Sequence, residues 1–311
     1  MSAKELVITA PEGIVVGGDA DEKYEYYNLV SGERIELTED EARKSKAWHL
    51  AFKRSIVAVN GGPAGVGGIV GACIDPPVSV SREEFANMGD DDWQSKFGAV
   101  KAIPDNVKLV PEGIEPAILG WCVERDGLWT PPPAKGWKIR LADGKGYAKM
   151  RIQEIDEDGV TVTLQYAVQA EKGGALSEDR TIVMEPGESF SFASGELVEP
   201  SGLNWDLQHT GEKLLLNSPV NGDGIAGAIG SNKYGAIWAE ITDPGDSIAY
   251  FMDEYGSLLR SPKWYRYNVD GTHKIHPNGA VYALRTTDGD FKVQIFEYSG
   301  VGNMKVRYEQ V

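Results

Sequence analysis

Histidine is the residue of this chain best suited to hold a metal, and only four occur: His49, His209, His273 and His276. The last two have H-x-x-H spacing in a turn-rich stretch. That spacing could place two imidazoles on one side of a loop and bind zinc, but no third ligand is apparent nearby. His49 and His209 lie in alternating, strand-like surroundings, where a hydrogen-bonded structural histidine is the simpler interpretation.

Catalytic motifs are absent from the sequence. It has no G-x-S-x-G, no H-E-x-x-H and no Cys–His pairing, and its 47 acidic residues are scattered over turns without selecting a pair. The glycines from Gly61 to Gly68 are not followed by the Lys-Ser/Thr of a phosphate loop. We therefore predict a structural loop there, with residues at positive φ, and a protein that is not an enzyme.

Charge and hydropathy exclude two classes of partner. The formal net charge is −16, whereas nucleic acids and anionic membrane surfaces attract clustered Lys and Arg. No apolar run approaches the roughly 20 residues of a transmembrane helix, so we predict no membrane span.

Residues 1–4 do not begin a signal peptide, which leaves a cytoplasmic protein or one whose leader was removed. Cys73 and Cys122 allow one disulfide or two buried thiols.

Short alternating runs rather than helical periods dominate the chain. Two stretches, 137–168 and 281–311, each predict a meander of three strands, with Asp143-Gly144 and Asp288-Gly289 as hairpin turns. Apolar residues at every second position then face one way, as in Val162, Leu164 and Tyr166. With 37 glycines and 13 tyrosines, the composition also favours an all-β protein with antiparallel sheets and long loops.

Landmarks recur in the same order in two halves of the chain, at separations of 163, 157, 157 and 145 residues. The pairs are Gly32 and Gly195, Trp48 and Trp205, Asn60 and Asn217, and Asp143 and Asp288. We therefore predict two tandem β domains, at residues 1–175 and 176–311, with the linker between Gln169 and Asp179.

Several local elements can also be assigned. Thr38 and Glu41 have the spacing of a capping box and predict a short helix. A second short helix is expected from Arg82 to Met88, and one strand from Trp48 to Val59. Pro11 to Asp21 is expected to be a polar loop.

Together, these motifs resemble the HmuY family of haem-binding proteins. The resemblance covers nearly the whole chain as a tandem pair. In the first copy it is carried by Trp48, Ala51, Phe52, Arg54, Asn60, Gly61, Gly62, Arg140, Asp143, Gly144, Lys149 and Ile152. In the second copy it is carried by Asn204, Trp205, Asp206, Asn217, Arg285, Asp288, Gly289, Lys292, Gln294 and Ile295.

The resemblance implies two HmuY-like β domains that capture haem or a related tetrapyrrole for iron acquisition. It implies a secreted protein or lipoprotein at the cell surface, in the periplasm or outside the cell. An outer-membrane receptor or a haem-carrying protein is its implied partner. Family members hold iron with axial His or Met, which here points to Met252, His273 and His276 as metal ligands. Trp264 and Tyr267 are the implied neighbours of the cofactor.

Two other functions remain open. The chain could be a non-catalytic surface interaction or structural protein that kept this scaffold and lost the iron ligands. A weaker alternative is a sugar-binding module that uses exposed tryptophans at Trp93, Trp129 or Trp238.

Overall fold

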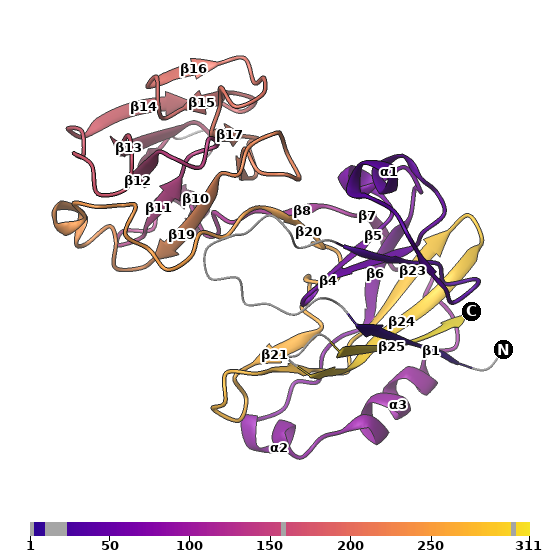
Figure 1. Ribbon diagram of the computed structural model, residues 1–311. Helices are drawn as coiled ribbons and strands as arrows, with labels where there is room; N and C mark the ends of the chain where they lie inside the picture. The colour runs from indigo at the N-terminus through magenta and orange to yellow at the C-terminus, as the bar shows by residue number, and fades with distance from the viewer. Residues whose placement is uncertain (1–2, 10–23, 157–159, 300–302) are drawn as a thin grey trace. The chain divides into compact units, whose positions relative to one another are not determined.

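The structure is a computed structural model that describes residues 3–9, 24–156, 160–299 and 303–311. Short antiparallel strands dominate it, with a few short helices (Figure 1), which confirms the all-β prediction. The loop expected from Pro11 to Asp21 lies outside the described residues. No helix in the described ranges is both long and apolar enough to cross a membrane.

The described residues form two compact units. Unit 1 contains residues 3–9, 24–114, 255–299 and 303–311, and unit 2 contains residues 115–156 and 160–254. The chain leaves unit 1 within β8 (Ile114–Glu115) and returns to it within β20 (Glu254–Tyr255). Unit 2 is therefore inserted in the sequence of unit 1.

Unit 1 is built on two antiparallel sheets. The larger has the order β1-β25-β24-β23-β6-β7 and the smaller has the order β3-β2-β4-β5. In Figure 1, the indigo β1 and the yellow β25 lie side by side, since the two ends of the described chain pair in this sheet. The strands and helices of these sheets and their connections are β1 Lys4–Thr9, β2 Glu25–Tyr27, β3 Arg34–Ile35, α1 Glu39–Lys44, β4 Leu50–Lys53, β5 Ile56–Val59, η1 Gly62–Ala64, β6 Val70–Asp75, α2 Arg82–Ala86, α3 Asp90–Ala99, β7 Val110–Pro111, β23 Val281–Thr286, β24 Gly289–Ser299 and β25 Asn303–Gln310. A separate hairpin joins β21 Tyr265–Tyr267 to β22 Ile275–Pro277.

Unit 2 also has two main antiparallel sheets. Their orders are β14-β13-β12-β11-β19 and β16-β15-β17-β18, and a small hairpin pairs β9 with β10. Its elements are β9 Val123–Arg125, β10 Leu128–Thr130, β11 Gly136–Arg140, β12 Tyr147–Ile155, β13 Val162–Gln169, β14 Arg180–Met184, β15 Ser189–Ser191, β16 Glu196–Val198, β17 Leu207–His209, β18 Leu214–Leu216, β19 Gly227–Ser231 and η2 Trp238–Glu240.

Both predicted meanders are present, as β11-β12-β13 and β23-β24-β25. Gly144 and Gly289 have φ of 72° and 131° in the turns, a region that glycine enters at little cost. The alternating side chains of β13, Val162, Leu164 and Tyr166, are almost fully buried in the core of unit 2. Period-two alternation therefore identified the buried face of this strand correctly.

The predicted domain boundary at residue 175 does not separate the compact units. It falls between β13 and β14, which pair side by side in one sheet of unit 2. The expected linker from Gln169 to Asp179 accordingly connects neighbouring strands within that unit. The reason is that each meander packs with strands from the other half of the sequence.

The local predictions have mixed outcomes. Thr38 caps α1 with the expected capping box, and α2 covers most of the second expected helix. The single strand expected from Trp48 to Val59 is wrong: it is the hairpin β4–β5, turned at Arg54 with φ of 52°. Helix α3 was not predicted, and it buries Trp93 and Phe97.

Candidate functional site

The hairpin β21–β22 of unit 1 carries two of the four histidines. Arg266 lies opposite His276 in its register, and Tyr267 lies opposite Ile275. Its turn contains three residues with positive φ: Asn268 at 57°, Gly271 at 80° and His273 at 58°. The backbone N–H of His273 donates to Oδ1 of Asn268 at 3.0 Å, which fixes the backbone of this histidine in a left-handed conformation.

His273 is the accessible imidazole of the hairpin, since the residue is exposed. Its Nδ1 lies 3.2 Å from the hydroxyl of Tyr267, and the two ring centroids are 6.0 Å apart. Tyr267 is 59% exposed and belongs to the neighbouring strand. Because Nδ1 is engaged by the phenol, Nε2 is the nitrogen with which this ring could bind a metal.

His276 is less accessible, with 32% of its side chain exposed. Within the described part of the chain its Nε2 is buried and has no hydrogen-bond partner, and Oδ1 of Asp270 lies 3.6 Å away. Hydrogen bonds from Thr272, with a smaller contribution from His276, lower the pKa of Asp270 to about 2. An ionised carboxylate thus faces His276, whose nitrogen becomes available to a ligand only if the Asp270 side chain turns away.

The predicted haem neighbour Trp264 and the predicted iron ligand Met252 are placed differently from the hairpin histidines. Trp264 is 1% exposed, its Nε1 donates to the carbonyl of Ser55 at 3.1 Å, and its ring packs edge-on against Tyr265 and Tyr298. It is a core residue and not the wall of an open pocket, which corrects the prediction. Met252 is partly buried in unit 2, whereas both candidate histidines belong to unit 1.

The remaining histidines have structural roles, as predicted. His49 is 2% exposed; its Nδ1 accepts from the N–H of Leu29 at 3.0 Å, and its Nε2 lies 3.1 Å from Oδ2 of Asp288. Burial lowers the pKa of His49, and Asp288 opposes that shift. His209 is fully buried beside Trp121 and hydrogen bonds through Nε2 to the carbonyl of Val160.

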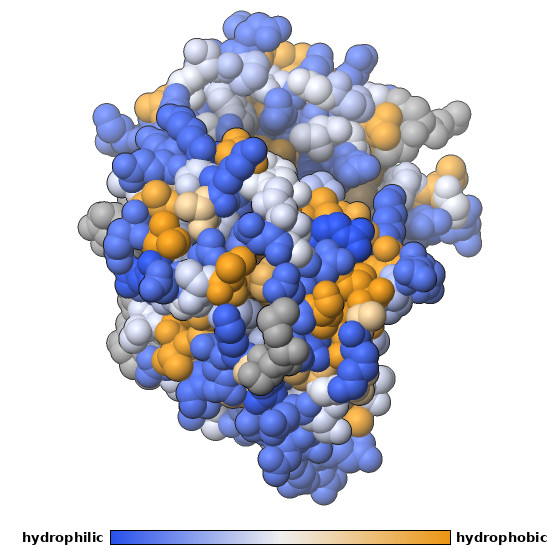
Figure 2. Space-filling model, turned by 90° about the vertical axis from the view of Figure 1, so that its right-hand side faces the viewer, coloured by the Kyte–Doolittle hydropathy of each residue, from blue (hydrophilic) through white to orange (hydrophobic). Residues whose placement is uncertain are grey.

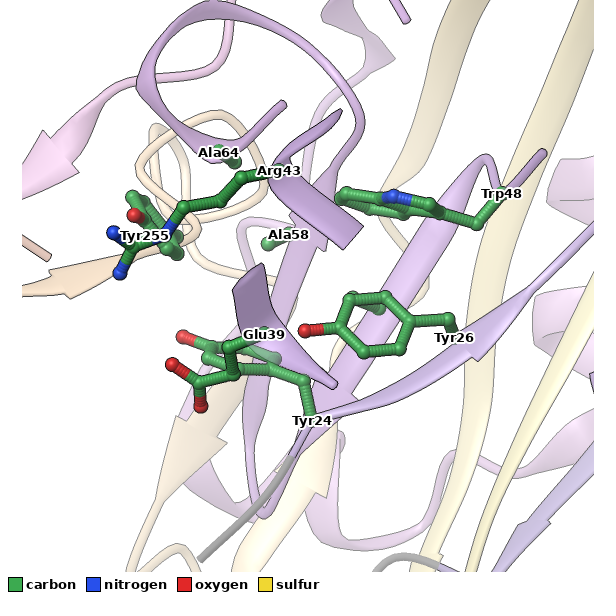
Figure 3. A pocket seen from close by; sticks show the side chains of 9 residues that line it. Tyr24, Tyr26, Glu39, Arg43, Trp48, Ala58, Ala64 and Tyr255 are labelled. Atoms are coloured by element: carbon green, nitrogen blue, oxygen red, sulfur yellow. The ribbon is translucent and has the colours of Figure 1, made fainter. Parts of the chain in front are cut away.

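A small hollow in unit 1 is lined by four aromatic side chains, three alanines and two charged residues (Figure 3). Its lining residues are Tyr24, Tyr26, Glu39, Arg43, Trp48, Ala51, Ala58, Ala64 and Tyr255. Ala51 and Ala58 lie directly opposite each other on β4 and β5, and these short side chains leave the space. Its empty volume is about 250 Å³ including space open to solvent. Pockets for drug-sized ligands are about 300–1,000 Å³, so a tetrapyrrole does not fit in it.

The structure also bears on the sugar-binding and metal-binding alternatives. Trp93 and Trp238 are 4% and 7% exposed, so neither offers the open ring that a sugar site needs, while Trp129 is 47% exposed. Among the described residues, no cluster of three or more His, Cys, Asp or Glu side chains could hold a metal ion. Zinc binding by the H-x-x-H pair therefore lacks a third protein ligand there.

Two buried carboxylates were not predicted. Glu112 and Asp253 are 2% and 1% exposed, and burial raises the pKa of both, that of Asp253 to about 6. Each stands just before a segment in which the chain passes from one unit to the other. Their sequence signal is weak, because both lie among many acidic residues in irregular stretches.

No family model matches the chain, and no curated protein matches it. Among solved structures, it is similar to a crystal structure from Bacteroides vulgatus ATCC 8482 described as an HmuY-like heme binding protein, itself a provisional assignment. That alignment covers 98% of this chain and 90% of the other, with 10% identity and a TM-score of 0.37. The family predicted from the sequence thus recurs in the structural comparison, but a likeness this distant carries no functional argument.

Proposed function

We propose that this protein is a non-catalytic binding protein for haem or a related tetrapyrrole, which it holds at the hairpin β21–β22. The observation that carries the proposal is how the four histidines are used. His49 and His209 are buried and hydrogen bonded inside the two cores. His273 and His276 are both on one hairpin and at least partly exposed, and His273 lies beside the phenol of Tyr267.

The chemistry of this hairpin suits haem iron. Imidazole nitrogen is a common axial ligand of haem, and a tyrosine oxygen also serves in some haem proteins. His273 is the more accessible ligand and would bind first through Nε2. His276 would follow after displacement of Asp270. Because His273 and Tyr267 are exposed, we expect weaker binding than in an enclosed apolar pocket.

Capture of haem for uptake, with transfer to a receptor or haem-carrying protein, would follow from this binding. An extracellular, periplasmic or cell-surface location belongs to the same proposal. It rests on the resemblance to the HmuY family. The net charge of −16 is compatible with it, since neither haem nor a protein receptor requires a basic surface.

Titration of the full chain with haemin, followed by absorption spectroscopy, tests the binding. We expect a saturable, sharpened Soret band that weakens strongly in His273→Ala and less in His276→Ala. Met252→Leu shows whether the methionine contributes. Lys274→Ala is the matched control, because Lys274 is exposed in the same turn and offers no usual haem ligand. An equal loss in Lys274→Ala, or a band unchanged in the double histidine variant, would remove the hairpin as the site.

The alternative is an interaction protein without haem, and one observation favours it. On the hairpin β9–β10, Leu128 and Trp129 are 60% and 47% exposed, which is unusual for large apolar side chains in neighbouring positions. An absorption spectrum identical to that of free haemin would favour this alternative. A Trp129→Ala variant that loses binding of an identified protein partner would then support it.

A further inference from the structure

The two units share one arrangement of strands. In unit 1 the two sheets have the orders β1-β25-β24-β23-β6-β7 and β3-β2-β4-β5. In unit 2 the corresponding orders are β14-β13-β12-β11-β19 and β16-β15-β17-β18. Each meander lies between an equivalent pair of strands, β1 and β6 in unit 1 and β14 and β19 in unit 2, and the sheet of unit 1 has β7 in addition. The order along the sequence differs, because the meander comes last in unit 1 and first in unit 2.

The pairing registers agree over residues 137–140 of β11 and 282–285 of β23. In unit 2, Ile139 of β11 lies opposite Ala228 of β19, and in unit 1 Leu284 of β23 lies opposite Gly71 of β6. These are corresponding positions of the two halves. The long hairpins also share an irregularity: the register shifts after Ile152 in β12 and after Ile295 in β24. A bulge at the same place in both is strong evidence of common origin, since bulges are specific features of a fold.

A buried asparagine makes the same three hydrogen bonds in both units. Asn60 donates from Nδ2 to the carbonyl of Trp48 at 2.9 Å, and its Oδ1 accepts from the N–H of Gly67 at 2.9 Å. Asn217 donates to the carbonyl of Trp205 at 2.8 Å and accepts from Gly224 at 2.9 Å. The third bonds go to the carbonyls of Ser45 and Gly202.

Contacts between the strands and the meanders cross from one half of the sequence to the other. A Cβ on Gly32, in the first half, would lie 3.0 Å from the hydroxyl of Tyr308, in the second. A Cβ on Gly195, in the second half, would lie 3.1 Å from the hydroxyl of Tyr166, in the first. Both glycines have φ near 75°, in the tight turn of the equivalent hairpins. The same contact is therefore made twice, each time between opposite halves.

The two buried carboxylates repeat this reciprocity where the chain changes units. Glu112, before the first crossing, accepts from the N–H of Leu258, after the second crossing, at 3.1 Å, and from the N–H of Val59 at 2.8 Å. Asp253, before the second crossing, accepts from Ala117, after the first, at 2.8 Å, and from Leu216 at 2.7 Å. Each carboxylate thus binds the segment that follows the opposite crossing.

We infer that the chain is a tandem repeat whose two copies have exchanged their three-stranded meanders. The strands β1 to β6 of the first copy form a docking surface whose occupant is the meander β23-β24-β25 of the second copy. The strands β14 to β19 of the second copy bind β11-β12-β13 of the first. This explains why the predicted boundary at residue 175 marks a repeat and yet lies inside a compact unit. Glu112 and Asp253 act as positioning residues that hold the two crossing segments in the exchanged arrangement.

Engineered disulfides in the full chain distinguish exchanged from unexchanged repeats. Val7 lies directly opposite Lys305 in unit 1, and Val183 lies directly opposite Thr163 in unit 2. Opposite residues in antiparallel strands have Cα atoms about 4.5–5.5 Å apart, within the range that a disulfide spans. Cys73 and Cys122 are first replaced by alanine. Mild oxidation and mass spectrometry of proteolytic peptides then show which pairs have joined.

We expect Val7→Cys/Lys305→Cys and Val183→Cys/Thr163→Cys to form disulfides within one chain. The matched controls are Val7→Cys/Thr163→Cys and Val183→Cys/Lys305→Cys, which would join each repeat to its own meander. These two pairs should remain reduced. A disulfide in either control pair of the monomer would show that each repeat keeps its own meander and would overturn the inference. A disulfide that joins two chains would overturn exchange within one molecule. Neither result depends on haemin, so this inference and the proposed function fail separately.

Discussion

Replacing Asn217 with alanine tests whether the buried asparagines organise the two units. Asn217 is fully buried in unit 2, and both of its polar side-chain atoms are hydrogen bonded. Alanine removes two donated bonds, to the carbonyls of Gly202 and Trp205, and one accepted bond from Gly224. The methyl group of alanine offers no donor or acceptor, so these three main-chain groups lose their side-chain partner.

The expected cost follows from these three bonds. A hydrogen bond contributes about 0.5–1.5 kcal/mol net, and a buried group left without a partner costs about 1–3 kcal/mol. We therefore expect Asn217→Ala to destabilise unit 2 by about 3 kcal/mol, and Asn60→Ala to destabilise unit 1 by a similar amount. Asn87→Ala is the control, because Asn87 is exposed at the end of α2, and surface changes cost within about 0.5 kcal/mol.

Hydrogen exchange read by mass spectrometry reports on each unit separately. Asn217→Ala should accelerate exchange in peptides of β17, β18 and β19, and leave peptides of β4, β5 and β6 nearly unchanged. Asn60→Ala should do the reverse. A cost below about 1 kcal/mol, or equal effects of Asn87→Ala and Asn217→Ala, would refute the reasoning from buried hydrogen bonds.

Three further predictions concern charge, glycine and cysteine. Burial raises the pKa of Asp253 from 3.8 to about 6, so the folded state favours the protonated carboxyl. The resulting contribution to the free energy of unfolding of unit 2 is fully present below pH 4 and is lost as the pH rises through 6. The loss is roughly 3 kcal/mol at most, and an Asp253→Asn variant with the same pH profile of unfolding as the natural chain would contradict it. Gly222→Ala should destabilise unit 2 by about 1–3 kcal/mol, because its Cβ would lie 2.3 Å from Oδ1 of Asn217. Gly98→Ala, in open space within α3, should stabilise unit 1 by up to about 1 kcal/mol, and urea unfolding that ranks the two alanine variants in the opposite order would count against this. Cys73 and Cys122 are free, and burial raises the pKa of both thiols. A thiol-reactive dye should therefore label two groups per chain in urea, and should label them slowly in the native protein. A disulfide between the two cysteines would contradict the structure.

Local features of the fold could be predicted because they depend on neighbouring residues. The Asp-Gly turn of each meander follows from the conformational freedom of glycine, and the buried face of β13 follows from the pleat of a strand. The capping box at Thr38 is likewise a relation between residues three apart. Helix α3 was missed although Asp90, Asp91 and Asp92 occupy its first turn, where acidic residues stabilise a helix.

The composition of the units could not be predicted from local patterns. Whether a meander packs on its own repeat or on the other depends on contacts far apart in the sequence, such as that of Gly32 with Tyr308. If the surfaces of the two repeats are alike, as their registers indicate, alternation and turn signals are the same for both arrangements. The predicted boundary at residue 175 therefore followed the repeat and not the packing.

The candidate site was predicted only in part for a similar reason. His273 and Tyr267 are exposed on one hairpin, as a ligand site requires, but Trp264 was expected beside a ligand and lies in the core. The sequence alone does not show whether a tryptophan next to a strand packs into the core or faces a ligand site. Glu112 and Asp253 escaped notice because nothing near them in the sequence distinguishes them from other acidic residues.

The stoichiometry of haemin binding tests the proposed function most directly, because the two units provide an internal comparison. Buried Trp121 immediately precedes the segment that forms β9–β10, as buried Trp264 precedes β21–β22, but only the second hairpin carries histidines. Titration of the full chain, followed at the Soret band, should reach its end point at one haemin per chain and lose that end point in His273→Ala/His276→Ala. Saturation at two haemins per chain, or a spectrum identical to that of free haemin throughout, would contradict binding at this hairpin.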